Sequence, residues 1–371
     1  MVDRAKVAVL TDPRKFDYRE VDIPDIGRDD GILRVEAAGL CGTDWEQYLG
    51  HLDDTPWAVR PVIPGHEILG WVDKIGSEAA KKWDVKEGDR VTVEASIPCG
   101  QCFQCQIGRA VLCKNGMGYG LRVGFDNPPH LWGGYATHMY LHPDATLHKA
   151  PSEIPTDIMS LFNPMSNAVR WAVERPETGI GDTVVIEGPG QRGLLAIVAA
   201  REAGAGKIIV TGTKDDNLRL SLARQLGADE TIVVDDGDPV ERVIDVTGGK
   251  LADIVVDVSA FATEPITQAI EMVRPGGKVV VAGLKSFKPI PNFISDKLIT
   301  KEISMLGVLS SSWSSVEKSI DIIRRKADLL KSLCTHHYPV NEAEKAVQVL
   351  GREVVDGAEA VHVHIDAAST T

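Results

Sequence analysis

Residues 183–194 read T-V-V-I-E-G-P-G-Q-R-G-L, and this stretch decides the fold of the chain around it. The opening letters form a β-branched run that predicts a strand, and Gly188, Gly190 and Gly193 then fit the pattern G-x-G-x-x-G. In that pattern the first glycine turns the chain tightly, the second lets the backbone approach a pyrophosphate, and the third lets helix and strand pack closely. We therefore expect a dinucleotide-binding turn between a strand and a helix. A glycine-rich turn without a ligand is the alternative.

The sequence on either side of this stretch predicts two kinds of domain. Lys207–Val210, Ile254–Val258 and Lys278–Ala282 are further β-branched runs separated by helical stretches. This alternation is typical of a doubly wound parallel sheet with crossover helices. Towards the N-terminus, short runs such as Ile32–Ala37 and Arg90–Glu94 are separated by Gly, Pro and Asp turns, which predicts an irregular β-rich lobe. The expected class is α/β.

Composition limits the partners of the chain. Its 371 residues exceed what one core usually organises, so two domains are expected. Lys and Arg number 40 against 53 Asp and Glu, and the net charge of -13 repels nucleic acids and anionic membranes. No segment reaches the length of a bilayer span, and the N-terminal residues lack the apolar core of a secretion signal. We expect a cytoplasmic protein with neither nucleic-acid nor membrane partners.

Four cysteines at positions 99, 102, 105 and 113 fall within one short loop. This spacing lets the loop surround a tetrahedral cation with four thiolates, which leaves no open coordination position. The sequence therefore predicts a structural zinc held by Cys99, Cys102, Cys105 and Cys113. Disulfides are the remaining alternative, and no other part of the chain suggests the electron transfer that would accompany an iron-sulfur cluster.

A second set of metal-binding residue types lies in the same lobe. Cys41 stands in G-L-C-G-T-D, residues 39–44, and His66 and Glu67 follow each other in P-G-H-E. A lone cysteine or histidine is more often packed in a core than bound to metal. Together, however, a thiolate, an imidazole and a carboxylate provide the mixed ligand shell of a catalytic zinc with one open position.

Taken in order, these motifs resemble the zinc-dependent medium-chain alcohol and polyol dehydrogenases, with threonine, sorbitol and sugar dehydrogenases as the nearest neighbours. The match covers nearly the whole chain and includes G-G-Y-A at 133–136, L-G-A-D at 226–229 and R-P-G-G at 274–277. The resemblance implies a GroES-like catalytic domain over 1–155, a Rossmann domain over 156–308, and a C-terminal segment over 309–371 that completes the catalytic domain. It also implies an active site in the cleft between them.

The resemblance implies one catalytic and one structural zinc. Cys41 and His66 would bind the catalytic ion, and Glu67 would be a ligand that exchanges with water. Asn163 stands where the family has a ligating Glu before Pro. An amide oxygen is a weaker, neutral donor, which leaves more positive charge on the metal. Asn163 as a turn residue before Pro164 is the alternative.

Three residues in the segment that follows Cys41, namely Thr43, Glu46 and His51, are expected to act in catalysis. Thr43 occupies the place where the family uses Ser or Thr to take the proton of the bound alcohol. Glu46 stands where many relatives have histidine, and would relay protons or bind substrate hydroxyls; a solvated carboxylate is the alternative. His51, close by in the sequence, is a secondary candidate.

The glycine motif and the resemblance together predict the coenzyme contacts. An acid at the end of the second strand would bind the ribose 2'-hydroxyl, but Gly212 stands there, followed by basic Lys214 and then by Asp215 and Asp216. We expect NAD over NADP, with either aspartate alternatively a helix cap. The expected contacts are Gly188, Gly190, Gln191, Arg192 and Gly193 in the turn, Gly212, Thr213 and Lys214 after the second strand, Val258 and Ser259 after the third, and Ala282, Gly283, Leu284 and Leu309 near the nicotinamide.

The implied activity is hydride transfer between a secondary alcohol, polyol or sugar, or the matching carbonyl compound, and a nicotinamide cofactor. Two alternatives remain. One is a protein that binds zinc and dinucleotide without redox turnover, and the other is a zinc-independent quinone or enone reductase, against which Cys41 and His66 argue. Relatives pair through an edge strand, here 307–309 or the 299–306 region, so a homodimer or homotetramer is expected.

Overall fold

The computed structural model describes residues 4–56, 58–355 and 359–369. The chain divides into two compact units, Met1–Asn163 with Ile323–Thr371, and Pro164–Ile322. These divisions fall within helices α5 (Phe162–Val169) and α11 (Trp313–Leu330). The domain limits expected from the sequence, after residues 155 and 308, lie shortly before the two helices.

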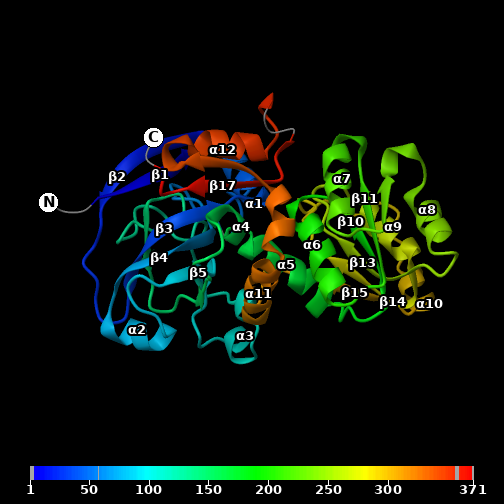
Figure 1. The fold of residues 1–371 in the computed structure, drawn as a ribbon, viewed down its shortest axis with the longest axis horizontal. Coiled ribbons are helices and arrows are strands. Elements are labelled where there is room, and N and C mark those ends of the chain that lie inside the picture. The colour runs from blue at the N-terminus through cyan, green and yellow to red at the C-terminus, as the bar shows by residue number, and fades with distance from the viewer. Residues whose placement is uncertain (1–3, 57, 356–358, 370–371) are drawn as a thin grey trace. The chain divides into compact units, whose positions relative to one another are not determined.

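The first unit is built mainly on antiparallel strands, with a parallel pair formed by its last two strands (Figure 1). Its strands are β1 (Arg4–Asp12), β2 (Lys15–Asp22), β3 (Gly31–Gly39), β4 (Glu67–Ile75), β5 (Arg90–Val93), β6 (Ser96–Ile97), β7 (Met117–Gly118), β8 (His138–Leu141), β9 (Leu147–Lys149), β16 (Cys334–Pro339) and β17 (His362–Asp366). Its helices include α1 (Gly42–Leu49), α2 (Ser77–Trp83), α3 (Phe103–Gln106), α4 (Thr156–Met159) and α12 (Ala343–Leu350), with 3-10 turns at Ala110–Leu112, Lys331–Leu333 and Val340–Glu342.

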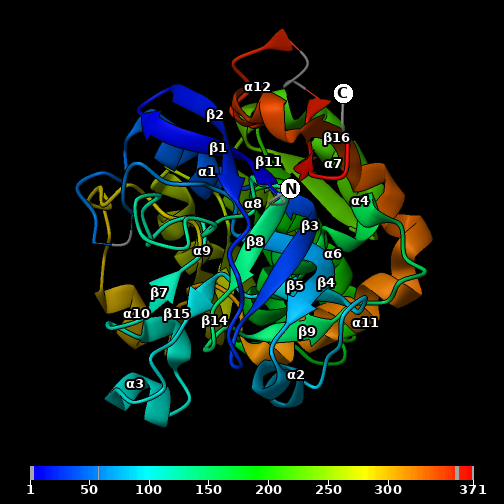
Figure 2. The ribbon, with the colours of Figure 1, turned by 90° about the vertical axis from the view of Figure 1, so that its left-hand side faces the viewer.

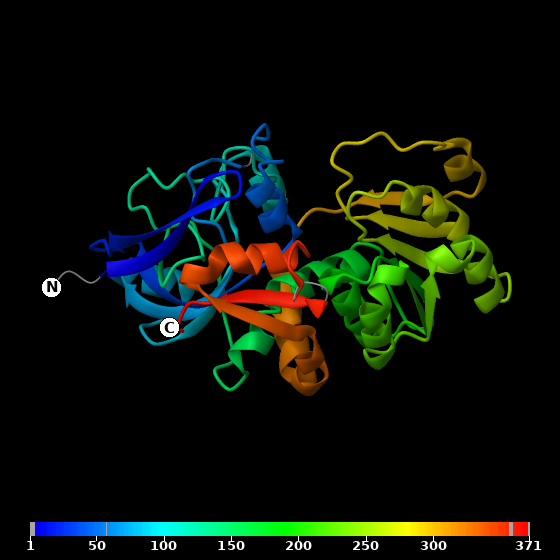
Figure 3. The same cartoon turned by 90° about the horizontal axis from the view of Figure 1, so that it is seen from above.

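The main sheet of this unit joins distant parts of the sequence. Its order is β16-β17-β3-β4-β5-β9, with β8 also paired to β3; Figure 2 shows β3, β4, β5 and β9 side by side. β17 pairs antiparallel with β3, Ile365 opposite Ala38, so the C-terminal segment completes the sheet. α12 contacts β17, as the orange helix and red strand show in Figure 3. Residues 323–371 thus belong to the same compact unit as the N-terminal strands.

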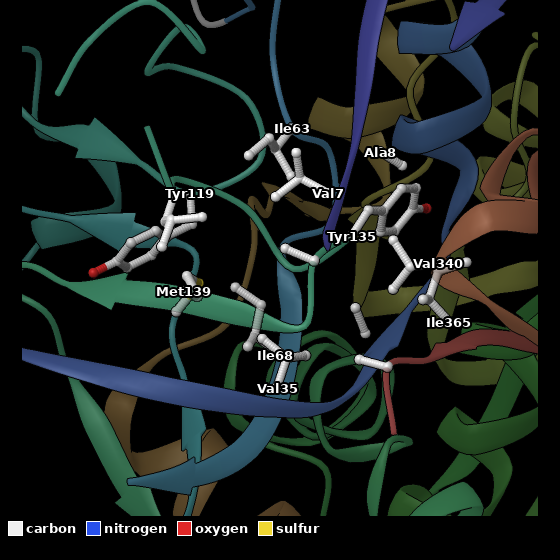
Figure 4. Packing of buried hydrophobic residues seen from close by; sticks show 14 of the residues in the cluster. Val7, Ala8, Val35, Ile63, Ile68, Tyr119, Tyr135, Met139, Val340 and Ile365 are labelled. Carbon is white, nitrogen blue, oxygen red and sulfur yellow. The ribbon is translucent and has the colours of Figure 1, made fainter. Parts of the chain in front are cut away.

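The core of the first unit lies between these strands. Val7 of β1, Val35 of β3, Ile68 of β4 and Ile365 of β17 are at most 1 % exposed, and they point into one cluster around Tyr135 (Figure 4). Burial of such side chains is worth about 1.5–3 kcal/mol each relative to exposure. This packing fixes the strand ends on which the metal-binding residues stand.

The second unit is a doubly wound parallel sheet of order β12-β11-β10-β13-β14-β15. Its predicted α/β class is confirmed. α6 and α7 contact each other, as do α8 and α9, and the strand order reverses between β10 and β13. The elements are the π-helical turn Arg170–Glu174, β10 (Thr183–Glu187), α6 (Gln191–Glu202), β11 (Lys207–Gly212), the 3-10 turn Lys214–Asp216, α7 (Asn217–Gln225), β12 (Glu230–Val233), the 3-10 turn Val234–Asp236, α8 (Pro239–Val246), β13 (Ala252–Asp257), α9 (Glu264–Met272), β14 (Val273–Val281), α10 (Asp296–Thr300) and β15 (Ser304–Gly307).

Among the residues that the structure describes, no helix is long and apolar enough to cross a membrane.

Candidate metal centres and dinucleotide site

The four clustered cysteines are close enough to bind one ion. Their sulfurs lie 3.5 Å apart between Cys102 and Cys105, 3.7 Å between Cys102 and Cys113, and 3.5 Å between Cys113 and Cys99. Zinc-sulfur bonds of about 2.3 Å place tetrahedral thiolates about 3.8 Å apart, whereas a disulfide needs about 2.05 Å. All four cysteines are free, so the disulfide alternative is wrong. The arrangement fits a closed, structural zinc site.

The second metal-binding set is assembled by the pairing of β3 with β4. Gly39 at the end of β3 faces Glu67 at the start of β4, so the residues just beyond, Cys41 and His66, meet at one end of the sheet. Both are buried, and Cys41 Sγ lies 3.3 Å from His66 Nε2. Tetrahedral zinc with bonds of about 2.3 Å to sulfur and about 2.0 Å to nitrogen separates these donors by about 3.5 Å. The donors therefore fit a zinc ion.

Asp44 completes this centre, although the sequence motifs do not mark it as a metal-site residue. Its Oδ2 accepts a 2.8 Å hydrogen bond from the backbone N–H of Cys41, which forms a capping box at the start of α1. Its Oδ1 lies 3.6 Å from His66 Nδ1, on the side of the ring opposite Cys41. The position of Asp44, three residues after the helix cap, is the signal that could have revealed it.

Electrostatics in this centre favour positive charge. Burial raises the pKa of Asp44, opposed by His66 and by the Cys41 N–H. Burial lowers the pKa of His66, but the neighbouring Asp44 and Cys41 outweigh this effect and raise it to about 10. Asp44 and Cys41, which stabilise positive charge on the imidazole, are equally suited to stabilise a metal ion.

Glu67 and Asn163 were predicted as further ligands. Glu67 is fully buried, and its Oε2 lies 2.7 Å from where a Cβ on Gly39 would stand, so this carboxylate lies against β3. Asn163 is buried in the first turn of α5, together with Pro164. The alternative of a turn residue before Pro164 is wrong because both residues are helical. Among the described residues, only Cys41, Asp44 and His66 form the compact donor group of this centre.

The three predicted catalytic residues lie on or just after α1. Thr43 is half-buried in its first turn. Glu46 has a side chain 18 % exposed, and its Oε2 lies 3.2 Å from Nδ1 of His51, whose side chain is 57 % exposed. The Glu46–His51 pair therefore joins a mostly buried carboxylate to an imidazole that is exposed to solvent.

In the second unit, each glycine of the turn has a separate reason to lack a side chain. Gly188 has φ +104°, and a Cβ there would stand 3.1 Å from the Ser259 backbone. A Cβ on Gly193 would stand 1.9 Å from the Gly188 carbonyl oxygen, so α6 packs closely on the turn. A Cβ on Gly190, the N-cap of α6, would meet nothing within 4 Å. The turn therefore leaves open space in front of the helix N-terminus, as a pyrophosphate requires.

The other predicted coenzyme residues surround this turn. Gln191 and Arg192 begin α6, so this helix starts within the glycine motif itself. The Arg192 guanidinium lies 5.7 Å from the centre of the Trp171 ring. Ala282 and Gly283 both donate to the Asp257 carbonyl oxygen at 3.0 Å, directly after β14. The remaining residues of this group lie after β13, after β14 and after β15: Val258, Ser259, Leu284 and Leu309.

The segment after β11 carries more negative than positive side chains. Gly212 has no room for a side chain, because a Cβ would stand 2.8 Å from Pro189 Cγ. Thr213 donates to Asp216 at 2.8 Å and is the N-cap of the 3-10 turn, in a capping box that Asp216 completes. Asp216 also stands at the N-cap position of α7, but its side chain makes no capping hydrogen bond to that helix. Lys214 pairs with Asp236 at 3.5 Å, and its N–H binds Asp235 at 2.8 Å.

Known proteins share both units. The family model of an alcohol dehydrogenase GroES-like domain matches residues 27–152, and that of a zinc-binding dehydrogenase matches 193–325. A probable alcohol dehydrogenase of Mycobacterium tuberculosis is 42 % identical over 323 residues, 86 % of each chain. An erythritol/L-threitol dehydrogenase of Mycolicibacterium smegmatis is 30 % identical over 98 % of each chain. The solved structure of an alcohol dehydrogenase from Thermotoga maritima has a TM-score of 0.87 and 29 % identity, covering 98 % of this chain and 99 % of its own.

Proposed function

The chain belongs to the family of zinc-dependent medium-chain alcohol and polyol dehydrogenases, and from this premise we propose that it oxidises a secondary alcohol, polyol or sugar with NAD at a zinc ion bound by Cys41 and His66. The oxidoreduction of alcohols or polyols predicted from the sequence is confirmed by its relatives. The observation that carries the proposal is the 3.3 Å approach of the Cys41 sulfur to the His66 nitrogen.

When bound, zinc supplies a Lewis acid that makes an alcohol easier to deprotonate, and the nicotinamide ring supplies the hydride acceptor. The residues of this chain hold and orient the groups that would bind the zinc ion. Asp44 holds His66 with Nε2 towards the metal position, because its carboxylate faces the other ring nitrogen. Glu67 and Asn163 are proposed as exchangeable or weaker donors to the same ion.

Protons leave the site by a proposed path along α1. The Thr43 hydroxyl both donates and accepts hydrogen bonds and lies two residues from Cys41, so it is placed to hold the hydroxyl proton of the substrate. Glu46 and His51, joined at 3.2 Å, connect this helix to solvent. A carboxylate and an imidazole in contact can pass a proton from one to the other.

The preference for NAD rests on charge. The segments after β11 and β12 present the carboxylates of Asp215, Asp216, Asp235 and Asp236, while Lys214 and Arg219 each pair with one of them. A 2'-phosphate would add negative charge to a site that already has a net negative charge, whereas a ribose hydroxyl would not. NADP is therefore expected to bind more weakly.

The assembly and compartment are also proposed. β15 is an edge strand, and Ile299, Leu309 and Trp313 near it are 74 %, 54 % and 61 % exposed. Exposed apolar side chains beside an unpaired edge favour pairing with a second copy, so we propose a homodimer or homotetramer. Six free cysteines fit a reducing compartment and favour the cytoplasm.

A substrate panel tests the proposal. Polyols, aldoses and simple secondary alcohols are incubated with NAD or NADP, and the absorbance of the reduced nicotinamide is followed. We expect turnover with NAD and loss of turnover in Cys41→Ser, while Cys334→Ser, which removes a free cysteine in β16, serves as the matched control. If the zinc-loaded wild type produced no reduced nicotinamide with any substrate, this result would favour the alternative of binding without turnover.

A further inference from the structure

Three ionisable side chains are buried together at the carboxyl ends of β10, β13 and the loop after β14. Glu187 and Asp257 are register partners in neighbouring parallel strands, so their side chains lie on the same face of the sheet. They are 1 % and 0 % exposed. Lys285, whose side chain is 8 % exposed, places Nζ 2.8 Å from one Asp257 oxygen and 3.1 Å from the other.

The lysine is in direct contact with one of the two carboxylates, that of Asp257. Burial raises the pKa of Glu187 well above its usual range, and repulsion from Asp257 adds to the effect while Lys285 opposes it. Burial also raises the pKa of Asp257, but Lys285 and the Ser259 donors oppose this. Lys285 and Asp257 therefore form the ion pair of this cluster, with the buried Glu187 side chain beside them.

The lysine also joins two loops. Its Nζ donates to the Ser259 carbonyl oxygen at 2.7 Å and lies 3.0 Å from Ser259 Oγ, so the loop after β14 is tied to the loop after β13. The same loops meet where the Phe261 N–H donates to the Leu284 carbonyl oxygen at 3.0 Å. Gly283 packs so closely that a Cβ would stand 1.9 Å from the Ser259 carbonyl oxygen. These contacts tie the two loops to each other.

The loops that Lys285 joins lie at the edge of the sheet where a dinucleotide would bind. In a doubly wound sheet a dinucleotide lies across the carboxyl ends of the strands, with its pyrophosphate at the first turn and its adenosine towards the second strand. Here the first turn follows β10 and the second strand is β11. The nicotinamide half must then lie over the ends of β13 and β14, where Lys285 joins the loops. Ser259 also stands against the first glycine of the turn, 3.1 Å from a Cβ on Gly188.

We propose that Lys285 is a positioning residue for the coenzyme: by binding Asp257 and both oxygens of Ser259, it holds the loops after β13 and β14 in the shape that receives the nicotinamide half. This inference rests on the proposed function, because it requires a nicotinamide coenzyme. A buried ion pair is seldom the most stabilising way to fill a core, since apolar residues of the same volume often serve as well. The four contacts of Lys285 instead specify one loop arrangement.

The test compares two ligands in Lys285→Met. NADH and 5'-AMP are titrated by calorimetry, because AMP occupies only the adenosine half of the site. Loss of charge-assisted hydrogen bonds predicts that the NADH affinity falls about tenfold or more, while the AMP affinity changes less than about twofold. Lys288→Met, an exposed lysine on the same loop, is the matched control and is expected to leave both affinities unchanged.

A double variant separates positioning from stability. Asp257→Asn with Lys285→Met removes the buried charge that the single variant leaves unpaired, so its melting temperature is expected to return towards that of the wild type. Its NADH affinity should stay low, because the tie to Ser259 is still missing. Recovery of NADH affinity in the double variant, an unchanged NADH affinity in Lys285→Met, or an equal loss of AMP affinity would each overturn the inference. A wild type that binds neither NADH nor NADPH would refute the proposed function itself.

Discussion

At the scale of single residues, Asp44 shows how one side chain serves both the fold and the site. One of its oxygens caps α1 through the Cys41 N–H, and the other faces His66. The sequence predicts Cys41 and His66 from their residue types, which are familiar zinc ligands. The position of Asp44 three residues after the helix cap gives a local signal for its contact with Cys41, but its contact with His66 and the contacts of Lys285 join residues distant in the sequence and have no such signal.

Replacing Asp44 by Asn tests this double role. The amide oxygen still accepts from Cys41, so α1 should keep its cap, but the negative charge beside His66 is lost. Loss of such an outer partner typically costs 10–100-fold in metal affinity. We expect a loss of about that size at one of two zinc sites, measured by competition with a chelator. Asp54→Asn, an exposed neighbour, is the control, and equal zinc affinity in the two variants would contradict the role of Asp44.

Two glycines of the turn after β10 predict opposite outcomes for the same substitution. Gly190→Ala adds a methyl group to open space at a φ of -66°, so the protein should keep its melting temperature but bind NADH at least about tenfold more weakly. Gly193→Ala forces a Cβ against the Gly188 carbonyl oxygen and should lower the melting temperature. Thermal unfolding and NADH titration of both variants check this. Normal NADH binding by Gly190→Ala would place the coenzyme elsewhere.

At the scale of elements, the strands with simple patterns were predicted well. Thr183–Glu187 forms β10 as expected, because a buried run of β-branched residues strongly favours a strand. β14 starts earlier than the predicted Lys278, at Val273. Its register with β13 shifts between Ala252 and Ile254, so the R-P-G-G segment is accommodated as an irregularity within the strand. Such an irregularity depends on the neighbouring strand and has no local signal.

The strands β16 and β17 carry a stack of histidines that makes the first unit sensitive to acid. The His364 ring lies 5.7 Å from that of His362 and 5.8 Å from that of His337. Burial, with repulsion from His337, lowers the pKa of His364 to about 4, although Asp366 and Asp157 oppose this. Burial, with repulsion from His364, also lowers the pKa of His362 well below its usual range. Both buried rings are therefore neutral at pH 7.

The sign of the resulting pH dependence follows from proton uptake. The unfolded chain binds a proton at His364 near pH 6.5, while the folded chain binds it only near pH 4. Stability is therefore fully present above pH 6.5 and falls as the pH drops towards 4, by at most about 3 kcal/mol for this residue. Urea unfolding from pH 7.5 to 5 should show a shallower decline in His364→Phe than in the wild type. Parallel declines would show that His364 is not responsible.

At the scale of the whole molecule, each unit contributes one half of the proposed chemistry. The β-rich unit carries both proposed zinc sites, and the parallel-sheet unit carries the proposed dinucleotide turn with the loops that Lys285 joins. The net charge of -13 agrees with a small, uncharged substrate. The fold class, and the clustering of the four cysteines and of Cys41 with His66, could be predicted because each motif is local in the sequence. The identity of the alcohol depends on side chains from many segments and has no such motif.

The zinc content of the purified protein, measured together with alcohol oxidation, tests the central claim most directly. With a closed site of four cysteines and an open site at Cys41 and His66, the wild type should hold about two zinc ions per chain. Cys41→Ser should hold about one, keep its affinity for NADH, and lose turnover. A single zinc in both proteins, or undiminished turnover in Cys41→Ser, would contradict the account.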